Sequence, residues 1–212
     1  EHSQNLPTDS ISFCDWKVLN LADNQLIQYL THTNWNDQND ILPRLATGYI
    51  QTSAPLHPRK LLIATGGFDE TLPAYQEYDL HLRMACLGFD FVNLPKILYQ
   101  VHKRSDSVGS NKLRQWRQQN RVIQRACKIL QDKGALTYER KTAMAEALIA
   151  GARRLMTKGA MSCAWRNFKD ACQIHPKGSI PCLRRLVYLL LLNSCSPTVR
   201  KCGSRLKQAL RS

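Results

Sequence analysis

Five carboxylates follow a double glycine in the stretch "GGFDETLPAYQEYDLHLRMACLGFD", which covers residues 66–90, and two of them stand at an expected helix start. Glu77 and Asp79 fall in the first turn of an expected helix that ends near Gly88. The helix dipole favours an ionised carboxylate there, and a glycine turn before it would aim that group into a cleft as a general base. The alternative is that both acids only balance the partial positive charge of the helix N-terminus.

The residues around this helix indicate an α/β region. The run "PRKLLIAT", which the double glycine ends, predicts a short helix, and a second short helix is expected soon after Asp40. Strands are expected where β-branched and aromatic residues gather, at 10–20, near 49–53, at 89–95 and at 97–102. The stretch "LIQYLTHTNWND" favours neither a helix nor a strand. The sequence therefore predicts one α/β region over residues 1–110.

From residue 111 onward the pattern is helical. Amphipathic stretches divided by glycine or proline lie at 112–134, 139–159, 160–176 and 180–212. The two middle stretches resemble one tetratricopeptide-like hairpin over about 143–176, which must pack on other elements because one hairpin cannot bury its own apolar face. Trp165, Phe168 and Leu155 are expected to be core residues. The second predicted domain is thus an all-α region over 111–212.

The charge divides at the same place. Residues 1–110 hold 8 Lys and Arg against 12 Asp and Glu, whereas residues 111–212 hold 22 against 4, which together give the net charge of +14. Such asymmetry suggests two regions with different partners. The hydrophobic content of 43% is typical of a globular chain and excludes a disordered one.

The cysteines and the apolar runs indicate a compartment. The eight cysteines form no CxxC pair and no zinc-like spacing with the histidines, so they are expected to be free thiols in a reducing cytosol. No apolar run approaches the roughly 18 residues of a membrane span. The sequence therefore predicts a cytoplasmic location, with possible contacts at the inner membrane face.

The order of four motifs resembles family 2 glycosyltransferases of the GT-A fold. A "GGFDE" turn, a "QEYDLHLR" helix start, a strand and a "YQVHKRSDS" end stand in this family's order between about residues 10 and 111. The resemblance implies the acceptor-side half of a Rossmann-like GT-A domain. It implies an inverting hexosyltransferase that moves a sugar from a nucleotide-sugar donor to an acceptor hydroxyl, in polysaccharide biosynthesis. The QxxRW motif of processive synthases is absent.

The resemblance assigns roles to the motif residues. The family's base is an Asp whose position is Glu77 here, and Asp79 matches a second acid that is more often structural, so both are candidates with Glu77 favoured. His81 stands where the family often has Trp, and it is expected to line the acceptor cleft or to be an exposed helix residue. The remaining turn residues are expected to shape the turn or to hold it by bonds to backbone amides: Gly66, Gly67, Asp69 and Glu70.

The resemblance also implies a divalent metal, Mn²⁺ or Mg²⁺, in the complete enzyme. His102 matches a position at which some members offer an imidazole to the metal or the diphosphate, and the alternative is a hydrogen-bonded residue at a strand end. No DxD motif, which holds the metal and donor in this family, occurs in the chain. The donor-binding half is therefore expected upstream of Glu1, and this chain alone is expected to be inactive.

Two other readings of the chain remain. The basic half could make it a nucleic-acid-binding protein, although no aromatic–basic motif supports this, or the helices could form an adaptor beside a vestigial transferase half. The basic residues of 180–212, next to the apolar run "LVYLLLLN", suit either contact with an anionic membrane surface or ordinary core packing. The expected acceptor is a saccharide or a lipid-linked one.

Overall fold

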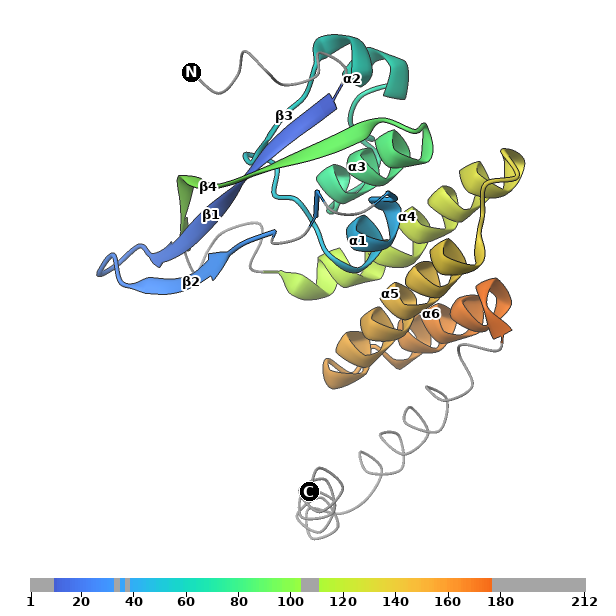
Figure 1. The fold of residues 1–212 in the computed structure, drawn as a ribbon. Coiled ribbons are helices and arrows are strands. Elements are labelled where there is room, and N and C mark those ends of the chain that lie inside the picture. The colour runs from blue at the N-terminus through green and yellow to red at the C-terminus, as the bar shows by residue number, and fades with distance from the viewer. Residues whose placement is uncertain (1–9, 33–34, 37–38, 104–110, 177–212) are drawn as a thin grey trace, which may run out of the picture.

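The computed structural model describes residues 10–32, 35–36, 39–103 and 111–176, and these form a mixed α/β fold (Figure 1). The helices are α1 (Leu42–Thr47), α2 (Arg59–Thr65), α3 (Gln76–Cys86), α4 (Lys112–Asp132), α5 (Tyr138–Thr157) and α6 (Met161–Ile174). The strands are β1 (Ser10–Asn20), β2 (Leu26–Leu30), β3 (Pro55–Leu56) and β4 (Asp90–Lys103).

The sheet is built around β1. Strand β4 runs parallel to β1 along its whole length, while β2 and β3 pair with it antiparallel. A parallel pair needs a long crossover between its strands, and α1, α2 and α3 lie in that connection. Two consecutive register shifts near Asp15 let the longer β4 follow β1.

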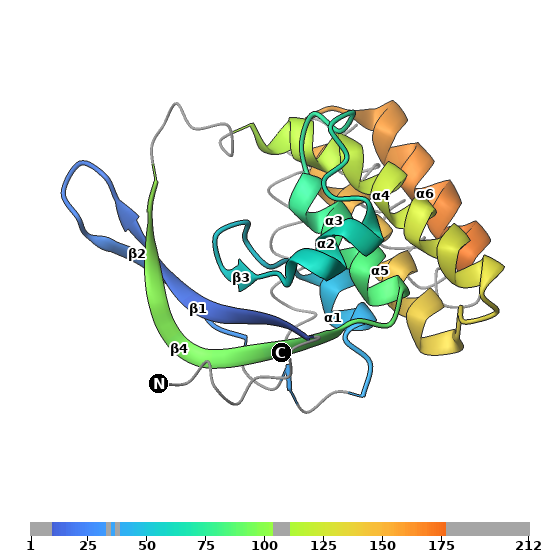
Figure 2. The ribbon, with the colours of Figure 1, turned by 90° about the horizontal axis from the view of Figure 1, so that it is seen from above.

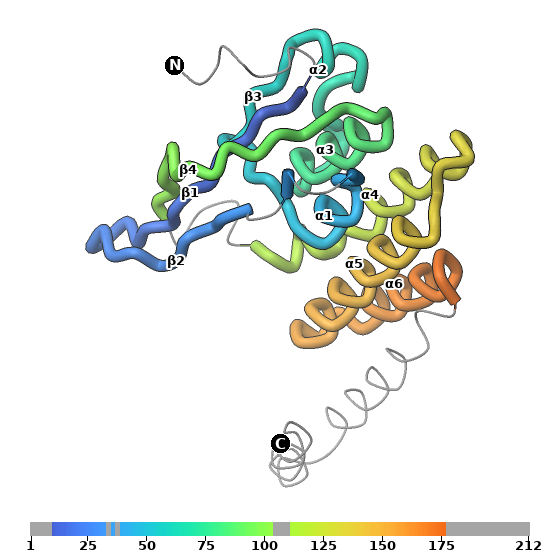
Figure 3. Tube along the Cα trace, viewed as in Figure 1, coloured from blue at the N-terminus to red at the C-terminus, as the bar shows by residue number. Residues whose placement is uncertain are grey.

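The helices lie on one side of the sheet (Figure 2). The β1–β2 hairpin and the second half of β4 extend past the helices, as the tube in Figure 3 also shows. All five residues of β2 are exposed or half-buried, whereas the first seven residues of β1 are buried. The part of the sheet under the helices is thus the part that belongs to the core.

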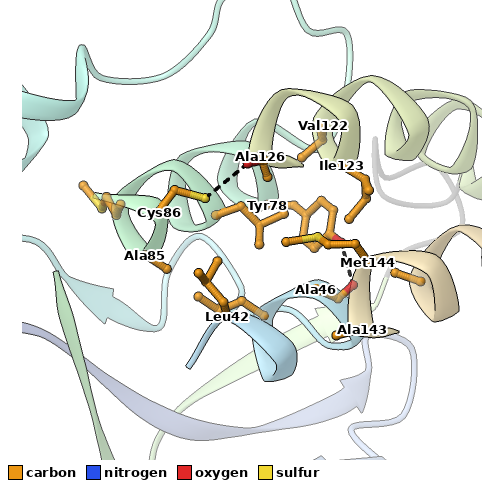
Figure 4. Close-up of a cluster of buried hydrophobic side chains, with 14 of the residues drawn as sticks. Leu42, Ala46, Tyr78, Ala85, Cys86, Val122, Ile123, Ala126, Ala143 and Met144 are labelled. Atoms are coloured by element: carbon orange, nitrogen blue, oxygen red, sulfur yellow. Dashed lines mark hydrogen bonds between the residues drawn. The ribbon is translucent and has the colours of Figure 1, made fainter. Parts of the chain in front are cut away.

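One continuous core joins the strands to the helical region. It runs from Ile11 in β1 through α1 and α3 to residues of α4, α5 and α6. At its centre, shown in Figure 4, the Tyr78 hydroxyl donates a 2.6 Å hydrogen bond to the Ala46 carbonyl. Burial at this position raises the pKa of Tyr78. The core therefore crosses residue 110, where the sequence suggested a division between domains.

The helices predicted within the described residues are confirmed, with their ends close to the expected residues. Asn111 and Thr137 cap α4 and α5 by accepting hydrogen bonds from backbone amides three residues later. The α5–α6 hairpin packs on α1 and α4, as its apolar face requires. Leu155 and Phe168 are buried as predicted, but Trp165 is 51% exposed. The prediction of a core position for Trp165 is therefore wrong, although its ring stacks on Phe168.

Two strand predictions are wrong. Residues 49–53 form no strand, and β1 instead pairs with Pro55 and Leu56, which lie just beyond them. The two strands expected at 89–95 and 97–102 are a single strand, β4. Pro95 does not interrupt β4 because it lies where the register shifts, so no ladder bond requires its missing amide.

Some expectations concern residues outside the described ranges, among them the tail 180–212. In the described residues, no helix is both long and apolar enough to cross a membrane. Among the described cysteines, Cys14, Cys86, Cys127 and Cys163 are free thiols, as predicted.

Candidate functional site

The double glycine turns the chain out of α2 toward α3. Gly66 and Gly67 have φ angles of 79° and 67°, a left-handed conformation in which a side chain is strained. Their amides bond back to carbonyls at the end of α2, which ends the helix. The motif thus performs the turn that its glycines predicted, and it brings Asp69 beside α3 and α4.

Asp69 holds this turn, as predicted. Its Oδ1 accepts hydrogen bonds from the Thr71 amide and hydroxyl, at 2.9 and 2.6 Å. Its Oδ2 lies 2.6 Å from Nη2 of Arg125 in α4. The bonds from Thr71 and from Arg125 lower the pKa of Asp69 to about 2. Glu70 is exposed and bonds no backbone amide of the described residues, so the same prediction is wrong for it.

Asp79 is enclosed by two guanidinium groups. Its side chain is 1% exposed, and Arg83, one helical turn later, donates from Nε to Oδ2 at 2.7 Å. Nη1 of Arg125 lies 2.9 Å from the other oxygen, Oδ1. Arg83 also donates to the carbonyls of Thr65 and Gly67 and so fastens the glycine turn to α3. Arg83 thus pairs with an acid one helical turn before it, and cations hold both oxygens of Asp79.

Glu77 has none of these partners. It is half-buried, and it makes no hydrogen bond or ion pair with another described residue. Burial and then the charge of Glu77 raise the pKa of Tyr49. Glu77 also contributes, after burial, to the raised pKa of Tyr75. The charge of Glu77 thus acts on two tyrosines, and Glu77 forms no ion pair with another described residue.

Aromatic rings border Glu77. Tyr75, directly before α3, has a φ of 69°, which is unusual for a bulky residue. Tyr49 is 44% exposed, and its ring centroid lies 6.1 Å from that of buried Trp16. Trp16 stacks in turn on Tyr99, at 5.9 Å. Burial raises the pKa of Tyr75, and the charge of Arg154 in α5 partly offsets this rise, so the helical region acts on this part of the fold.

The prediction for His81 is wrong. Its side chain lies in the core, 1% exposed, and neither lines an open cleft nor faces solvent. Its Nε2 is 3.1 Å from Nε2 of His57, and its ring meets Phe91 edge to face. Burial, with a smaller contribution from His57, lowers the pKa of His81 to about 3. His81 is thus held neutral in the core, in contact with the half-buried His57.

His102 lies near the end of β4, opposite Leu19, and is exposed. This position agrees with the interpretation of His102 as a strand-end residue. Its role as a ligand of a metal or diphosphate stays a prediction. In the described ranges, no three His, Cys, Asp or Glu side chains form a group that could hold a metal ion. The residues described here thus do not fit a complete metal site.

Sequence reasoning missed Arg125 and Tyr49. Arg125 is one of many basic residues on an amphipathic helix, and only its spacing of four from Arg121 hinted at a shared face. Tyr49 was assigned to a strand and is instead a half-exposed loop residue. No local signal relates either residue to α3, because both contacts join segments far apart in the sequence.

Comparisons with models of protein families, with curated proteins and with solved structures gave no match to this chain.

Proposed function

We propose that this chain carries the acceptor-side half of a GT-A glycosyltransferase that transfers a sugar from a nucleotide-sugar donor with inversion. The order of the GGFDE turn, the QEYDLHLR helix and the following strand suggests it. The fold is compatible with this assignment, because β1 and β4 are parallel and α3 lies in the crossover between them. The turn and helix start are held together by bonds that the motif residues themselves make.

The observation that carries the proposal is the contrast between two acids of α3. Asp79 is buried and ion-paired on both oxygens, whereas Glu77 is half-buried and has no cationic partner among the described residues. A general base must have an oxygen that can accept a proton from the substrate. Of the two candidates, only Glu77 meets this requirement.

The proposed role of Glu77 is to take the proton from the acceptor hydroxyl as its oxygen attacks the anomeric carbon of the donor. The bond from that carbon to the nucleoside diphosphate breaks on the opposite side, so the configuration inverts. The start of α3 supports the ionised form of Glu77 through the helix dipole. The described residues thus supply proton transfer and acceptor binding. Donor binding and the divalent metal are assigned to residues outside them.

The shared core weighs against the helical adaptor as the alternative. The helices do not form a separate unit, because α5 packs on α1 and α4 in the same core as β1. Arg125 of α4 also binds both Asp69 and Asp79. The helical region is therefore built into the proposed catalytic half.

The proposal is tested on the protein that the complete coding sequence specifies. Release of nucleoside diphosphate is measured with a panel of nucleotide sugars and cell-derived acceptors, for the wild type and for Glu77→Gln. We expect Glu77→Gln to lower the rate by a factor on the order of 10²–10⁴, with sugar-nucleotide binding nearly unchanged. Normal turnover by Glu77→Gln would overturn the assignment of the base.

A further inference from the structure

The exposed side of α4 carries a row of cations. We call it the basic row and define it by Arg114, Arg117, Arg121, Arg125 and Lys128. Its members are three or four residues apart, so they share one face of the helix. The row extends over about 21 Å, at 1.5 Å per residue. All of its members are exposed except Arg125, which is half-buried, and the acid of α4, Asp132, is the last residue of the helix.

Most of the charge of the basic row is not balanced within the described part of the fold. Asp69 and Asp79 lie beside the third and fourth members of the row. Arg114, Arg117 and Lys128 form no ion pair with any residue that the structure describes. Like charges one turn apart destabilise a helix. A folded helix that keeps such a row on its exposed side is therefore expected to meet an anionic partner.

Two hollows border the basic row, and cations outnumber acids in the walls of both. The first lies between α4 and the glycine turn, and its charged residues are Asp69, Arg83, Arg121 and Arg125. The second lies between α4, the start of α5 and the end of α6, where Lys128 and Lys141 are the charged residues of its wall. Guanidinium and ammonium groups both bind phosphate oxygens. The row and its hollows thus suit a surface that presents separate phosphate groups.

The residues beside the basic row favour a lipid surface over a nucleic acid. Sequence readout of bases uses amide side chains that reach base edges. The amides beside the row are half-buried or buried instead: Gln115, Gln118, Gln119, Asn120 and Gln124. Apolar side chains are exposed at the neighbouring turn, where Phe68 is 45% exposed between two residues of the first hollow and Ile63, near the end of α2, is 63% exposed. Apolar side chains next to cations are typical of a protein face that lies on a membrane.

We propose that the basic row of α4 is the face by which this protein docks on an anionic lipid surface, with its cations against the phosphates of the head groups. Each Lys or Arg near such a surface strengthens binding by a factor of about five. The inference goes beyond the proposed glycosyltransferase activity and does not depend on it. It also concerns a different surface from 180–212, the segment that the sequence related to a membrane and that lies outside the described residues.

Docking is tested on the 212-residue chain by co-sedimentation with lipid vesicles at low salt. One set of vesicles contains phosphatidylcholine and phosphatidylglycerol, and the control set contains phosphatidylcholine alone. We expect the wild type to pellet with the anionic vesicles and to stay in solution with the neutral ones. The pelleted fraction should fall as the salt concentration rises, because salt screens exposed charges.

Two triple variants of equal net charge separate the basic row from positive charge in general. The row variant carries Arg114→Gln, Arg117→Gln and Lys128→Gln. The control variant removes three exposed cations of α1 and β4, by Arg44→Gln, Lys96→Gln and Lys103→Gln. We expect the row variant to bind anionic vesicles about tenfold to a hundredfold more weakly than the wild type, and the control variant to stay within about threefold. Urea unfolding should be the same for both, since they replace exposed side chains without ion pairs to described residues.

Three results overturn the inference. The first is a folded wild-type chain that does not pellet with anionic vesicles, or that pellets equally with neutral ones. The second is an equal loss of binding in the two triple variants, which would assign the binding to net charge or to the segment 180–212. The third is an RNA oligonucleotide that binds the wild type more tightly per phosphate than the vesicles do and binds the row variant weakly, which would make the row a nucleic-acid surface.

Discussion

Glu77 and Asp79 are two residues apart in α3, yet their carboxylates meet different surroundings. Side chains at this spacing point to different sides of a helix. Asp79 faces α4 and the glycine turn, where Arg83 and Arg125 bind both of its oxygens. Glu77 acts on the pKa of Tyr49 and Tyr75, and it forms no ion pair with any residue that the structure describes. One helix start thus carries an acid that holds the structure together and another that is available for chemistry.

Removal of the structural acid should have the largest effect on stability. Asp79→Asn leaves Arg83 and Arg125 without the charge that balances them, and loss of one partner from a buried ion pair costs about 3–5 kcal/mol. We therefore expect the free energy of unfolding in urea to fall by about 3 kcal/mol or more. Glu77→Gln is the matched control and should change it by less than about 0.5 kcal/mol. Equal losses for the two variants would remove the contrast between the acids.

A somewhat smaller loss is expected when the cation from α4 is removed. Arg125→Gln deletes charged hydrogen bonds to Asp69 and Asp79, which contribute about 1.5–3 kcal/mol. Arg121→Gln, one turn earlier, is the control, because Arg121 is half-exposed and 3.6 Å from Asp69. It should cost about 0.5 kcal/mol.

The same Arg125 variant should change the response to acid. The pKa of Asp69 is about 2 in the fold and near 3.8 otherwise, so its contribution to stability is present above pH 4 and lost as the pH falls toward 2. Without Arg125 this acid-induced loss should shrink. If Arg125→Gln lost as much stability between pH 4 and pH 2 as the wild type does, Thr71 alone would set the pKa of Asp69.

A third titratable residue of α3, on the same side of the helix as Glu77, should make stability depend on pH. His81 follows Glu77 by one helical turn but lies in the core, with a pKa of about 3 against 6.5 when exposed. Between these values the unfolded chain binds one more proton, so stability falls with falling pH by about 1.4 kcal/mol per pH unit. From pH 7 to pH 5 the loss should be about 2 kcal/mol.

His81→Leu should flatten this dependence, while exposed His102→Gln should leave it as it is. Urea unfolding at pH 5 and pH 7 gives the difference for each variant. If the free energy of unfolding of His81→Leu still falls between pH 7 and pH 5, another group causes the pH dependence. His57 is then the next residue to test.

The sequence predicted the local elements well and the long-range contacts poorly. The bounds of α4, α5 and α6 followed from apolar periodicity and from their caps, which are properties of neighbouring residues. The strand expected at 49–53 failed because a strand needs a partner, and β1 pairs with Pro55 and Leu56 instead.

In the candidate site, too, the local features were predictable and the long-range contacts were not. The glycine turn and the helix start at Glu77 were visible in the motif. The burial of His81 depends on His57, which lies 24 residues earlier. The role of Asp79 depends on Arg125, 46 residues later. Neither contact has a local signature.

The rates of sugar transfer by Glu77→Asp and Glu77→Gln in the complete protein test the central claim most directly. The resembled family has Asp at this position, and Asp keeps a proton-accepting carboxylate that Gln lacks. We expect Glu77→Asp to retain activity within about tenfold of the wild type, and Glu77→Gln to lose a factor on the order of 10²–10⁴, at unchanged stability. Equal activity of the two variants would contradict a catalytic role for Glu77.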